Sequence, residues 1–222
     1  MNDTVKVSEL LDLSHTIAAE LFEGISYPWE ALAGIKDFIL ALGPRLDKEL
    51  YTEISENVWV AKDAKIAPTA FLGAPCIIDS GAEVRHCAFI RGSAIVGKNA
   101  VVGNSVELKN VVLFDNVQTP HYNYVGDSIL GYKAHMGAGS ITSNVKSDKS
   151  LVVVKGAGVL AETGRKKFGA ILGDNVEVGC NSVLNPGTVI GRCSNIYPCS
   201  SVRGVVPANS IYKSKTEIAE KY

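Results

Sequence analysis

Residues 60–108, VAKDAKIAPTAFLGAPCIIDSGAEVRHCAFIRGSAIVGKNAVVGNSVEL, repeat an aliphatic residue at every sixth position. A second, mostly small, residue follows four positions after each of them. A period of six matches neither the 3.6-residue period of a helix nor the alternation of a single strand, so the stretch is a hexapeptide repeat. Its aliphatic positions are Val60, Ile66, Leu72, Ile78, Val84, Ile90, Val96, Val102 and Leu108. Its second positions are Ala64, Ala70, Cys76, Ala82, Ala88, Ala94, Ala100 and Val106.

A period of six predicts a parallel β-helix, in which each hexapeptide contributes one short strand and one corner. Three hexapeptides close a triangular coil of eighteen residues, and successive coils stack about 4.8 Å apart. The aliphatic residue faces the interior, and the small residue fits the tight space near the turn. We therefore expect an all-β main domain over residues 56–212.

The repeat stops after residue 144 and resumes at Leu172. The interval 145–169, VKSDKSLVVVKGAGVLAETGRKKFG, lacks the period and predicts a loop or hairpin that leaves the β-helix. Long ordered loops on rigid scaffolds are frequently functional. The later aliphatic positions are Leu172, Val178, Leu184, Ile190, Ile196 and Val202.

The two ends of the chain differ from the repeat. Within residues 1–55, the segment SYPWEALAGIKDFILALG has apolar residues at helical spacing, with Pro28 near its start and Gly43 beyond its end. An exposed end of a stacked β-helix leaves unpaired backbone groups, so we expect a small N-terminal α-helical cap over the first coil. The C-terminal tail, residues 213–222, is expected to cover the other end.

Composition excludes several classes of function. The 222 residues carry 22 Lys and Arg against 23 Asp and Glu, so no basic field exists to hold nucleic acid or an anionic membrane. The N-terminal segment does not read as a secretion signal, and no apolar run is long enough for a membrane span. The five cysteines form no CxxC pair, and we interpret them as reduced core or turn residues. We expect a cytoplasmic protein.

Two cations lie eighteen residues apart, which is one coil. Arg91 and Lys109 each directly follow an inward aliphatic residue, so we expect them to stack on one face. At about 5 Å their repulsion costs on the order of 3 kcal/mol at an effective dielectric constant near 20, unless an anion lies between them. The alternative is that both side chains extend into solvent or that Glu107 compensates their charge.

One histidine lies where the repeat changes step. After Leu108 the next inward aliphatic residue is Leu113, five positions on, and Thr119 then takes an inward position. His121 follows at a corner where side chains point outward, and in trimers of such β-helices the corners form clefts between subunits. A histidine ordinarily titrates near neutral pH, so His121 is a candidate base, although a lone histidine is commonly only structural.

Residues 91–110, RGSAIVGKNAVVGNSVELKN, and 120–144, PHYNYVGDSILGYKAHMGAGSITSN, resemble a known family. They are similar to the acetyltransferase domain of the bifunctional bacterial enzymes that acetylate glucosamine-1-phosphate and then uridylylate the product. The VGNSVE coil, the H-x-x-Y-x-G-D motif and the GAGSITSN turn carry the likeness. It implies a left-handed parallel β-helix, a homotrimer and acetyl-CoA as co-substrate, without a metal.

The resemblance also implies roles for individual residues. Arg91 and Lys109 would hold the sugar phosphate with help from Tyr124. His121 would be the general base for the sugar amine, and Asn144 would position the sugar or the acetyl group. Two further residues follow by position: backbone N–H groups around Ala138 would stabilise the oxyanion, and His135 would contact the substrate.

The resemblance implies that acetyl-CoA lies along the later coils. Cys180 and Pro198, one coil apart, take the positions of small residues in the family. Lys213 and Lys215 would meet the nucleotide phosphates. The alternative is that both lysines belong to a solvated basic tail.

The chain departs from the family pattern at several places. His135 replaces an asparagine, Val145 replaces a tyrosine, and TGRKKFGAILGDNVEVG resembles archaeal sugar-1-phosphate nucleotidylyltransferases, which carry a similar C-terminal β-helix. No glycine-rich nucleotide loop is present, so we expect only the acetylation half. Which amino sugar and which acyl group are used stays open at this point.

Two other functions compete with an N-acetyltransferase. A γ-type carbonic anhydrase needs two histidines five apart, whereas His86, His121 and His135 are separated by 35 and 14 residues. The second alternative is a non-catalytic β-helix scaffold whose N-terminal helices dock a separate nucleotidyltransferase. A non-catalytic scaffold does not need a base, two stacked cations and a GAG turn in register, so this feature favours the enzyme.

Overall fold

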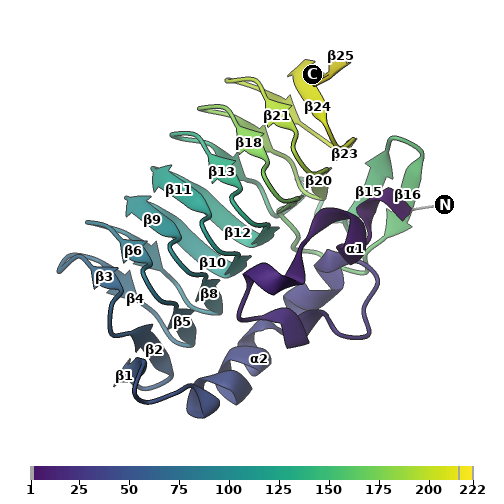
Figure 1. The fold of residues 1–222 in the computed structure, drawn as a ribbon. Coiled ribbons are helices and arrows are strands. Elements are labelled where there is room, and N and C mark those ends of the chain that lie inside the picture. The colour runs from purple at the N-terminus through teal and green to yellow at the C-terminus, as the bar shows by residue number, and fades with distance from the viewer. Residues whose placement is uncertain (1–2, 215, 222) are drawn as a thin grey trace.

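The main body of the chain is a parallel β-helix (Figure 1). The computed structural model describes residues 3–214 and 216–221. Strands in successive coils pair in parallel register, which confirms the all-β fold class predicted from the period of six. Seven of the nine aliphatic positions in residues 60–108 are buried. Ile66 and Leu72 of the first coil are only partly buried.

Each coil has three sides, which we call faces A, B and C in chain order. Strands β10 and β12 run across the corner from face C to face A, and each therefore pairs with strands on both faces. Face A comprises β2 (Val58–Ala61), β5 (Cys76–Ile78), β8 (Ala94–Val96), the second parts of β10 (Glu107–Leu113) and β12 (Tyr124–Leu130), β17 (Ala170–Leu172), β20 (Thr188–Ile190) and β23 (Val205–Val206).

Faces B and C complete each coil; the outward residues of face B are mostly polar, whereas those of face C include the exposed Phe71 and Phe89. Face B comprises β3 (Lys65–Ile66), β6 (Glu83–Val84), β9 (Val101–Asn104), β11 (Gln118–His121), β13 (His135–Met136), β18 (Glu177–Val178), β21 (Asn195–Ile196) and β24 (Ser210–Ser214). Face C comprises β4 (Phe71–Leu72), β7 (Phe89–Ile90), the first parts of β10 and β12, β14 (Ile141–Thr142), β19 (Val183–Leu184) and β22 (Ser201–Val202).

The corners explain most of the cysteines. Cys87, Cys193 and Cys199 have φ values of 61°, 59° and 57°, so they occupy left-handed corner positions. Cys76 is buried, and none of the five forms a disulfide. This agrees with reduced core and turn residues.

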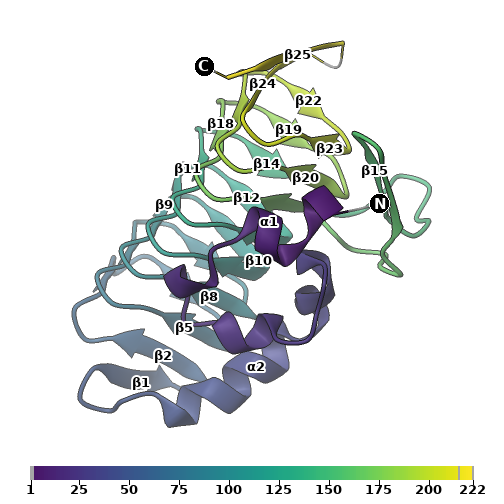
Figure 2. The same ribbon diagram turned by 45° about the vertical axis from the view of Figure 1, so that its right-hand side comes forward.

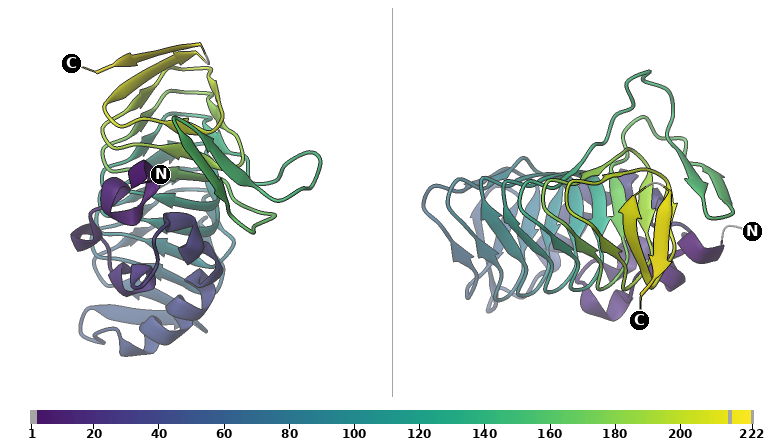
Figure 3. Two further views of the ribbon diagram at one scale, coloured as in Figure 1. Left: turned by 90° about the vertical axis from the view of Figure 1, so that its right-hand side faces the viewer. Right: turned by 90° about the horizontal axis from the view of Figure 1, so that it is seen from above.

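The N-terminal segment does not cap the first coil as predicted; it lies along face A (Figures 2 and 3). Residues 3–45, here called the arm, begin beside the later coils and end with α2 beside the first coils. Helix α2 contacts β8 and β10, and η4 contacts β12. The arm comprises η1 (Asp3–Val5), α1 (Val7–Leu10), η2 (Leu13–His15), η3 (Ala19–Phe22), η4 (Pro28–Ala33), α2 (Ile35–Leu42) and η5 (Gly43–Arg45).

The reason for this placement is the outer surface of face A, which is apolar. Its outward column is buried at 0–5 % exposure, and it could not face water without a large hydrophobic cost. The arm covers this column instead of the end of the stack. The outward residues are Trp59, Ile77, Ile95, Val112, Ile129, Ile171 and Val189.

The ends of the β-helix are covered by strands. Strand β1 (Tyr51–Ser55) pairs antiparallel with β2, so the last residues of the predicted helical segment 1–55 are extended. At the other end, β25 (Glu217–Glu220) pairs antiparallel with β24, and the predicted boundary at residue 212 falls inside β24. None of the helices in residues 3–214 and 216–221 is long and apolar enough to cross a membrane.

The interval 145–169 contains a hairpin that projects from the stack (Figure 3). Strand β15 (Val153–Gly156) pairs antiparallel with β16 (Val159–Glu162). Its base is closed by the Phe168 N–H, which donates to the Asn144 carbonyl at 2.9 Å, and by the Gly169 N–H, which donates to the Asp127 carbonyl at 2.8 Å. The base of the excursion is thus held by residues on a corner of the β-helix.

The N-terminal part of the arm, around residues 10–15, is anchored at the corner between faces A and B. The Asp12 N–H donates to Oδ2 of Asp174 at 2.8 Å, and the Asp174 N–H donates to the Leu10 carbonyl at 3.0 Å. The His15 ring stacks on Tyr132 with centroids 3.7 Å apart and planes 8° apart. Both hydrogen bonds of the backbone and the stacked rings therefore hold the arm on the β-helix.

We expect His15→Ala to lower the free energy of unfolding by about 1 kcal/mol, the usual size of one aromatic pair. The hydrogen bond from the Asp115 N–H to the His15 carbonyl, 3.0 Å, stays available because it involves only backbone atoms. Urea denaturation of both proteins measures the difference. An unchanged midpoint would show that the ring stack contributes nothing to holding the arm.

Candidate active site

Arg91 and Lys109 lie on the corner between faces C and A, in neighbouring coils. The Arg91 N–H donates to the Leu108 carbonyl at 2.9 Å, which places the two cations one above the other. Neither cation is unpaired: Nη1 of Arg91 lies 2.7 Å from Oε1 of Glu107, and Nζ of Lys109 lies 2.9 Å from Oδ1 of Asp127. The hydrogen bond that Arg91 donates to the Glu107 carboxylate raises the pKa of Arg91. Glu107 therefore neutralises the charge of Arg91, which was one of the alternatives that the sequence left open.

Asp127, a residue whose role is not evident from the repeat, is the centre of this corner. The residue is 2 % exposed, and its carboxylate accepts hydrogen bonds from three side chains. These are Nζ of Lys109 at 2.9 and 3.1 Å, Nδ2 of Asn110 at 3.0 Å, and Nδ2 of Asn144. A buried carboxylate needs such donors to offset the loss of water. Asp127 thus fixes the positions of Lys109 and Asn144 relative to one another.

Tyr124 joins this group from face C. Its hydroxyl lies 3.3 Å from Nδ2 of Asn144, so the structure brings together the predicted Lys109, Tyr124 and Asn144. Burial raises the pKa of Tyr124, and the carboxylates of Glu107 and Asp127 raise it further. The phenol therefore remains protonated at neutral pH and can act as a hydrogen-bond donor.

The excursion brings a third cation towards the same corner. Burial lowers the pKa of Arg165, and the Asp127 carboxylate acts in the opposite direction. Arg165 lies near the base of the excursion, where its Nε donates to the Lys167 carbonyl at 3.4 Å. The corner thus has three cations, Arg91, Lys109 and Arg165, and two carboxylates, those of Glu107 and Asp127. The surplus of positive charge suits an anionic ligand.

His121 lies on a different corner, between faces B and C. It ends β11 and is exposed, and it pairs in register with Asn104 of the coil below. Its backbone N–H donates to Oδ1 of Asn123 at 3.2 Å. Asn123 is buried and donates through Nδ2 to the carbonyls of Gly137 at 2.9 Å and Ser140 at 3.0 Å. These hydrogen bonds hold the backbone of the corner in place, while the His121 side chain remains exposed.

The predicted acetyl-CoA residues continue the same corner in later coils. The Gly139 N–H donates to the His121 carbonyl at 3.0 Å, the Asn181 N–H to the Ala138 carbonyl at 2.8 Å, and the Cys199 N–H to the Cys180 carbonyl at 2.8 Å. These bonds align one column along the corner. The column runs through His121, Ala138, Cys180 and Pro198, and Cys180 and Pro198 are exposed.

Three predicted site residues stand apart from these groups. His135 lies on face B, where its Nδ1 is 2.7 Å from Oε2 of Glu177, so a single chain does not bring it to the Asp127 group. Its outward position in β13 directs it away from face C. Lys213 lies in β24 with its Nζ 2.8 Å from Oε1 of Glu217. Lys215 lies outside the described residues.

The two corners border the same face. Face C carries Tyr124 between them, and Tyr124 follows His121 by three residues, which span at most about 11 Å. Face C thus lies between the cations at one corner and the imidazole at the other, with Tyr124 on it.

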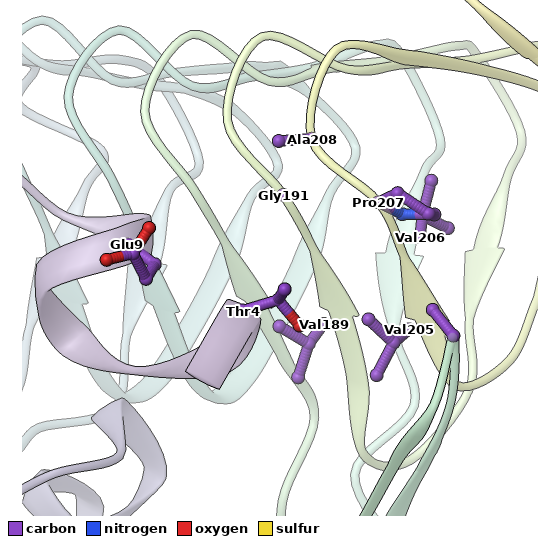
Figure 4. A pocket seen from close by; sticks show the side chains of 9 residues that line it. Thr4, Glu9, Val189, Gly191, Val205, Val206, Pro207 and Ala208 are labelled. Atoms are coloured by element: carbon purple, nitrogen blue, oxygen red, sulfur yellow. The ribbon is translucent and has the colours of Figure 1, made fainter. Parts of the chain in front are cut away.

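The pocket in Figure 4 is separate from this arrangement. It has a volume of about 200 Å³ and lies between the arm, the hairpin and the late strands of face A, with Thr4, Glu9, Val189 and Val205 in its lining. None of the candidate site residues lines it. Among residues 3–214 and 216–221, no group of three His, Cys, Asp or Glu side chains could hold a metal ion.

The fold and the repeat define a β-helix of the hexapeptide-repeat class. The GMPPB C-terminal domain family matches residues 73–194, and the chain belongs to that family. Together with the relatives described next, this match confirms the resemblance that residues 91–110 and 120–144 have to the acetyltransferase domain of the bifunctional enzymes.

Curated relatives carry related names. The "Bifunctional protein GlmU" of Methanococcus vannielii is 30% identical over 224 residues, which cover 98% of this chain and 54% of the relative. The "Bifunctional sugar-1-phosphate nucleotidylyltransferase/acetyltransferase" of Sulfurisphaera tokodaii is 34% identical over 106 residues, or 48% of this chain and 26% of that protein. This chain spans about half the length of the first of these relatives.

A solved acetyltransferase structure is among the structural neighbours of this chain. The polysialic acid O-acetyltransferase OatWY is 14% identical, with 71% of this chain and 84% of that chain covered and a TM-score of 0.31.

Proposed function

We propose that this chain is an acetyl-CoA-dependent N-acetyltransferase that acts on an amino-sugar phosphate, with glucosamine-1-phosphate as the first candidate. The observation that carries the proposal is the pair of corners that border face C. One corner joins cations to Tyr124 and Asn144, and the other carries an accessible histidine. The acetyltransferase named in the Sulfurisphaera tokodaii relative supports the reaction class.

The arrangement gives each end of the substrate its own corner. The phosphate binds Arg91 and Lys109, and the sugar ring lies on Tyr124 and Asn144. The amino group then faces His121. Charge-assisted hydrogen bonds to phosphate are among the stronger polar contacts, so they can fix the orientation of the sugar.

In the proposed reaction the amine nitrogen attacks the thioester carbonyl of acetyl-CoA. A nitrogen–carbon bond forms, the carbon–sulfur bond breaks, and coenzyme A leaves as a thiolate. His121 accepts the proton that the nitrogen loses and returns it to the thiolate. Backbone N–H groups near Ala138 stabilise the oxyanion of the tetrahedral intermediate. No covalent enzyme intermediate is involved, so the cysteines take no part.

We further propose a cytoplasmic homotrimer, in which acetyl-CoA lies along the corner formed by His121, Cys180 and Pro198. The arm covers face A, so faces B and C are available to neighbouring copies. A neighbouring copy placed against either face would border the corner of His121 and exclude water from it. Lys213, once released from Glu217, is positioned to meet a cofactor phosphate.

The direct test is a screen of amino-sugar phosphates with acetyl-CoA, in which thiol release is followed in real time. We expect release with glucosamine-1-phosphate and none with N-acetylglucosamine-1-phosphate, whose nitrogen is already acylated. Absence of thiol release with every amino-sugar phosphate would overturn the proposed function.

A second test addresses the phosphate corner. We expect Arg91→Ala to raise KM for the sugar phosphate roughly tenfold, about 1.5 kcal/mol, because one charged hydrogen bond is lost. Arg45→Ala is the matched control, since Arg45 also forms an exposed ion pair, 3.0 Å from Glu20, but within the arm. Steady-state kinetics in both substrates measures the change. Equal KM values in the two variants would remove Arg91 from the site.

A further inference from the structure

Asn110 connects the arm to the candidate phosphate site. It sits at the corner between faces C and A with a φ of 54°, a left-handed conformation that asparagine tolerates. Its Nδ2 donates to the Leu32 carbonyl of the arm at 3.1 Å and to Oδ1 of Asp127 at 3.0 Å. A side-chain amide has two N–H donors, and here one serves the arm and the other serves Asp127.

A second contact joins the same two regions. Trp29 of the arm packs against Phe168 with ring centroids 5.9 Å apart. Phe168 in turn donates its N–H to the Asn144 carbonyl at 2.9 Å. Trp29 and Leu32 both belong to η4, so one short element of the arm touches both sides of the Asp127 group.

We propose that the arm is a structural part of the phosphate site and that Asn110 is the positioning residue that links them. The proposal rests on the proposed function. Asp127 holds Lys109 and Asn144, and Asn110 supplies its third side-chain donor. Without that donor, the Asp127 carboxylate draws more strongly on Lys109 and leaves it less available to a phosphate. Substrate binding and the closure of η4 on face A are therefore coupled, and such coupling acts equally in both directions.

Asn110→Gly isolates the side-chain amide, because glycine adopts the same left-handed conformation without strain. Asn99→Gly is the matched control, since Asn99 has the same φ of 54° but lies at the corner between faces A and B. We expect Asn110→Gly to raise KM for glucosamine-1-phosphate about tenfold, the effect of one lost hydrogen bond to a charged group. KM for acetyl-CoA should not change in either variant.

Hydrogen exchange over residues 28–42 provides a readout that a simple loss of stability does not reproduce. We expect glucosamine-1-phosphate to slow exchange in this segment of the wild type and of Asn99→Gly. The same ligand should have no such effect in Asn110→Gly. Saturating concentrations, set from each KM, keep occupancy equal.

The outcomes separate the two proposals. If the wild type turns over and Asn110→Gly matches Asn99→Gly in KM and in exchange, the coupling is wrong and the proposed function stands. If the wild type neither acetylates nor binds glucosamine-1-phosphate, the proposed function fails and the coupling falls with it. A selective loss of sugar-phosphate affinity and of ligand protection in Asn110→Gly supports the coupling.

Discussion

His121→Ala is expected to lower kcat by about a hundredfold or more while the proposed trimer remains intact. General base catalysis by a positioned side chain contributes about 10²–10⁴-fold in enzymes, and no other predicted catalytic base occupies this corner. His121 is exposed and its corner is held by Asn123, so the fold does not depend on the imidazole. Steady-state kinetics measures the effect, and size-exclusion chromatography checks assembly.

The chain offers a matched control for this substitution. His86 lies on the same corner two coils below, and its Nδ1 is 2.9 Å from the Thr69 hydroxyl. We expect His86→Ala to leave kcat unchanged. If His121→Ala retains full turnover, the assignment of the base is wrong, whatever the behaviour of His86→Ala.

Lys109→Met is expected to lower the free energy of unfolding by about 3 kcal/mol. The substitution keeps most of the side-chain length but removes the ammonium group from Asp127, whose side chain is 3% exposed. A buried charge that loses its partner typically costs about 3–5 kcal/mol. The lower figure applies because Asn110 and Asn144 still donate to the carboxylate. Urea denaturation gives the value directly.

The double variant Lys109→Met/Asp127→Asn tests the cause of that loss. Asparagine removes the unpaired charge with little change in shape, so we expect stability to recover by at least half. No recovery would mean that the methionine itself disturbs the corner. The double variant should still bind sugar phosphate poorly, because the cation is missing, and a normal KM would exclude Lys109 from the phosphate site.

The period of six predicted the β-helix and much of the candidate site. The regular step placed Arg91 over Lys109, and it placed His121 at a corner, because register in a stacked coil follows directly from chain length. Ala138 was assigned from the family resemblance. The same counting placed Cys180 and Pro198 one coil apart, which agrees with the hydrogen bond from the Cys199 N–H to the Cys180 carbonyl. These relations depend on the backbone alone and need no knowledge of side-chain conformations.

The residue spacing did not predict the role of Asp127, for a specific reason. Asp127 lies eighteen residues after Lys109, but the five-residue step to Leu113 shortens that coil, and Lys109 pairs in register with Gly126. Which carboxylate reaches which cation depends on side-chain conformations at a corner, and residue spacing does not determine them. The motif H-x-x-Y-x-G-D contained the residue, so its aspartate was the available signal.

The sequence also contains a signal for the face that the arm covers. Each strand of face A from β5 to β23 has an outward aliphatic residue, as in Ile77, Ile95 and Val112, where face B carries mostly polar residues. This second apolar column predicts a covered face. The contact between Leu32 and Asn110 is different, because it joins residues 78 positions apart through a backbone carbonyl, which leaves no pattern in the sequence.

The most direct test of the account is a crystal structure of the protein with glucosamine-1-phosphate and coenzyme A. We predict that the phosphate oxygens lie about 2.7–2.9 Å from the Arg91 and Lys109 nitrogens. The amino group should face an imidazole of residue 121, from the same or a neighbouring copy. A sugar phosphate bound away from face C, with its nitrogen remote from every copy of His121, would contradict the account.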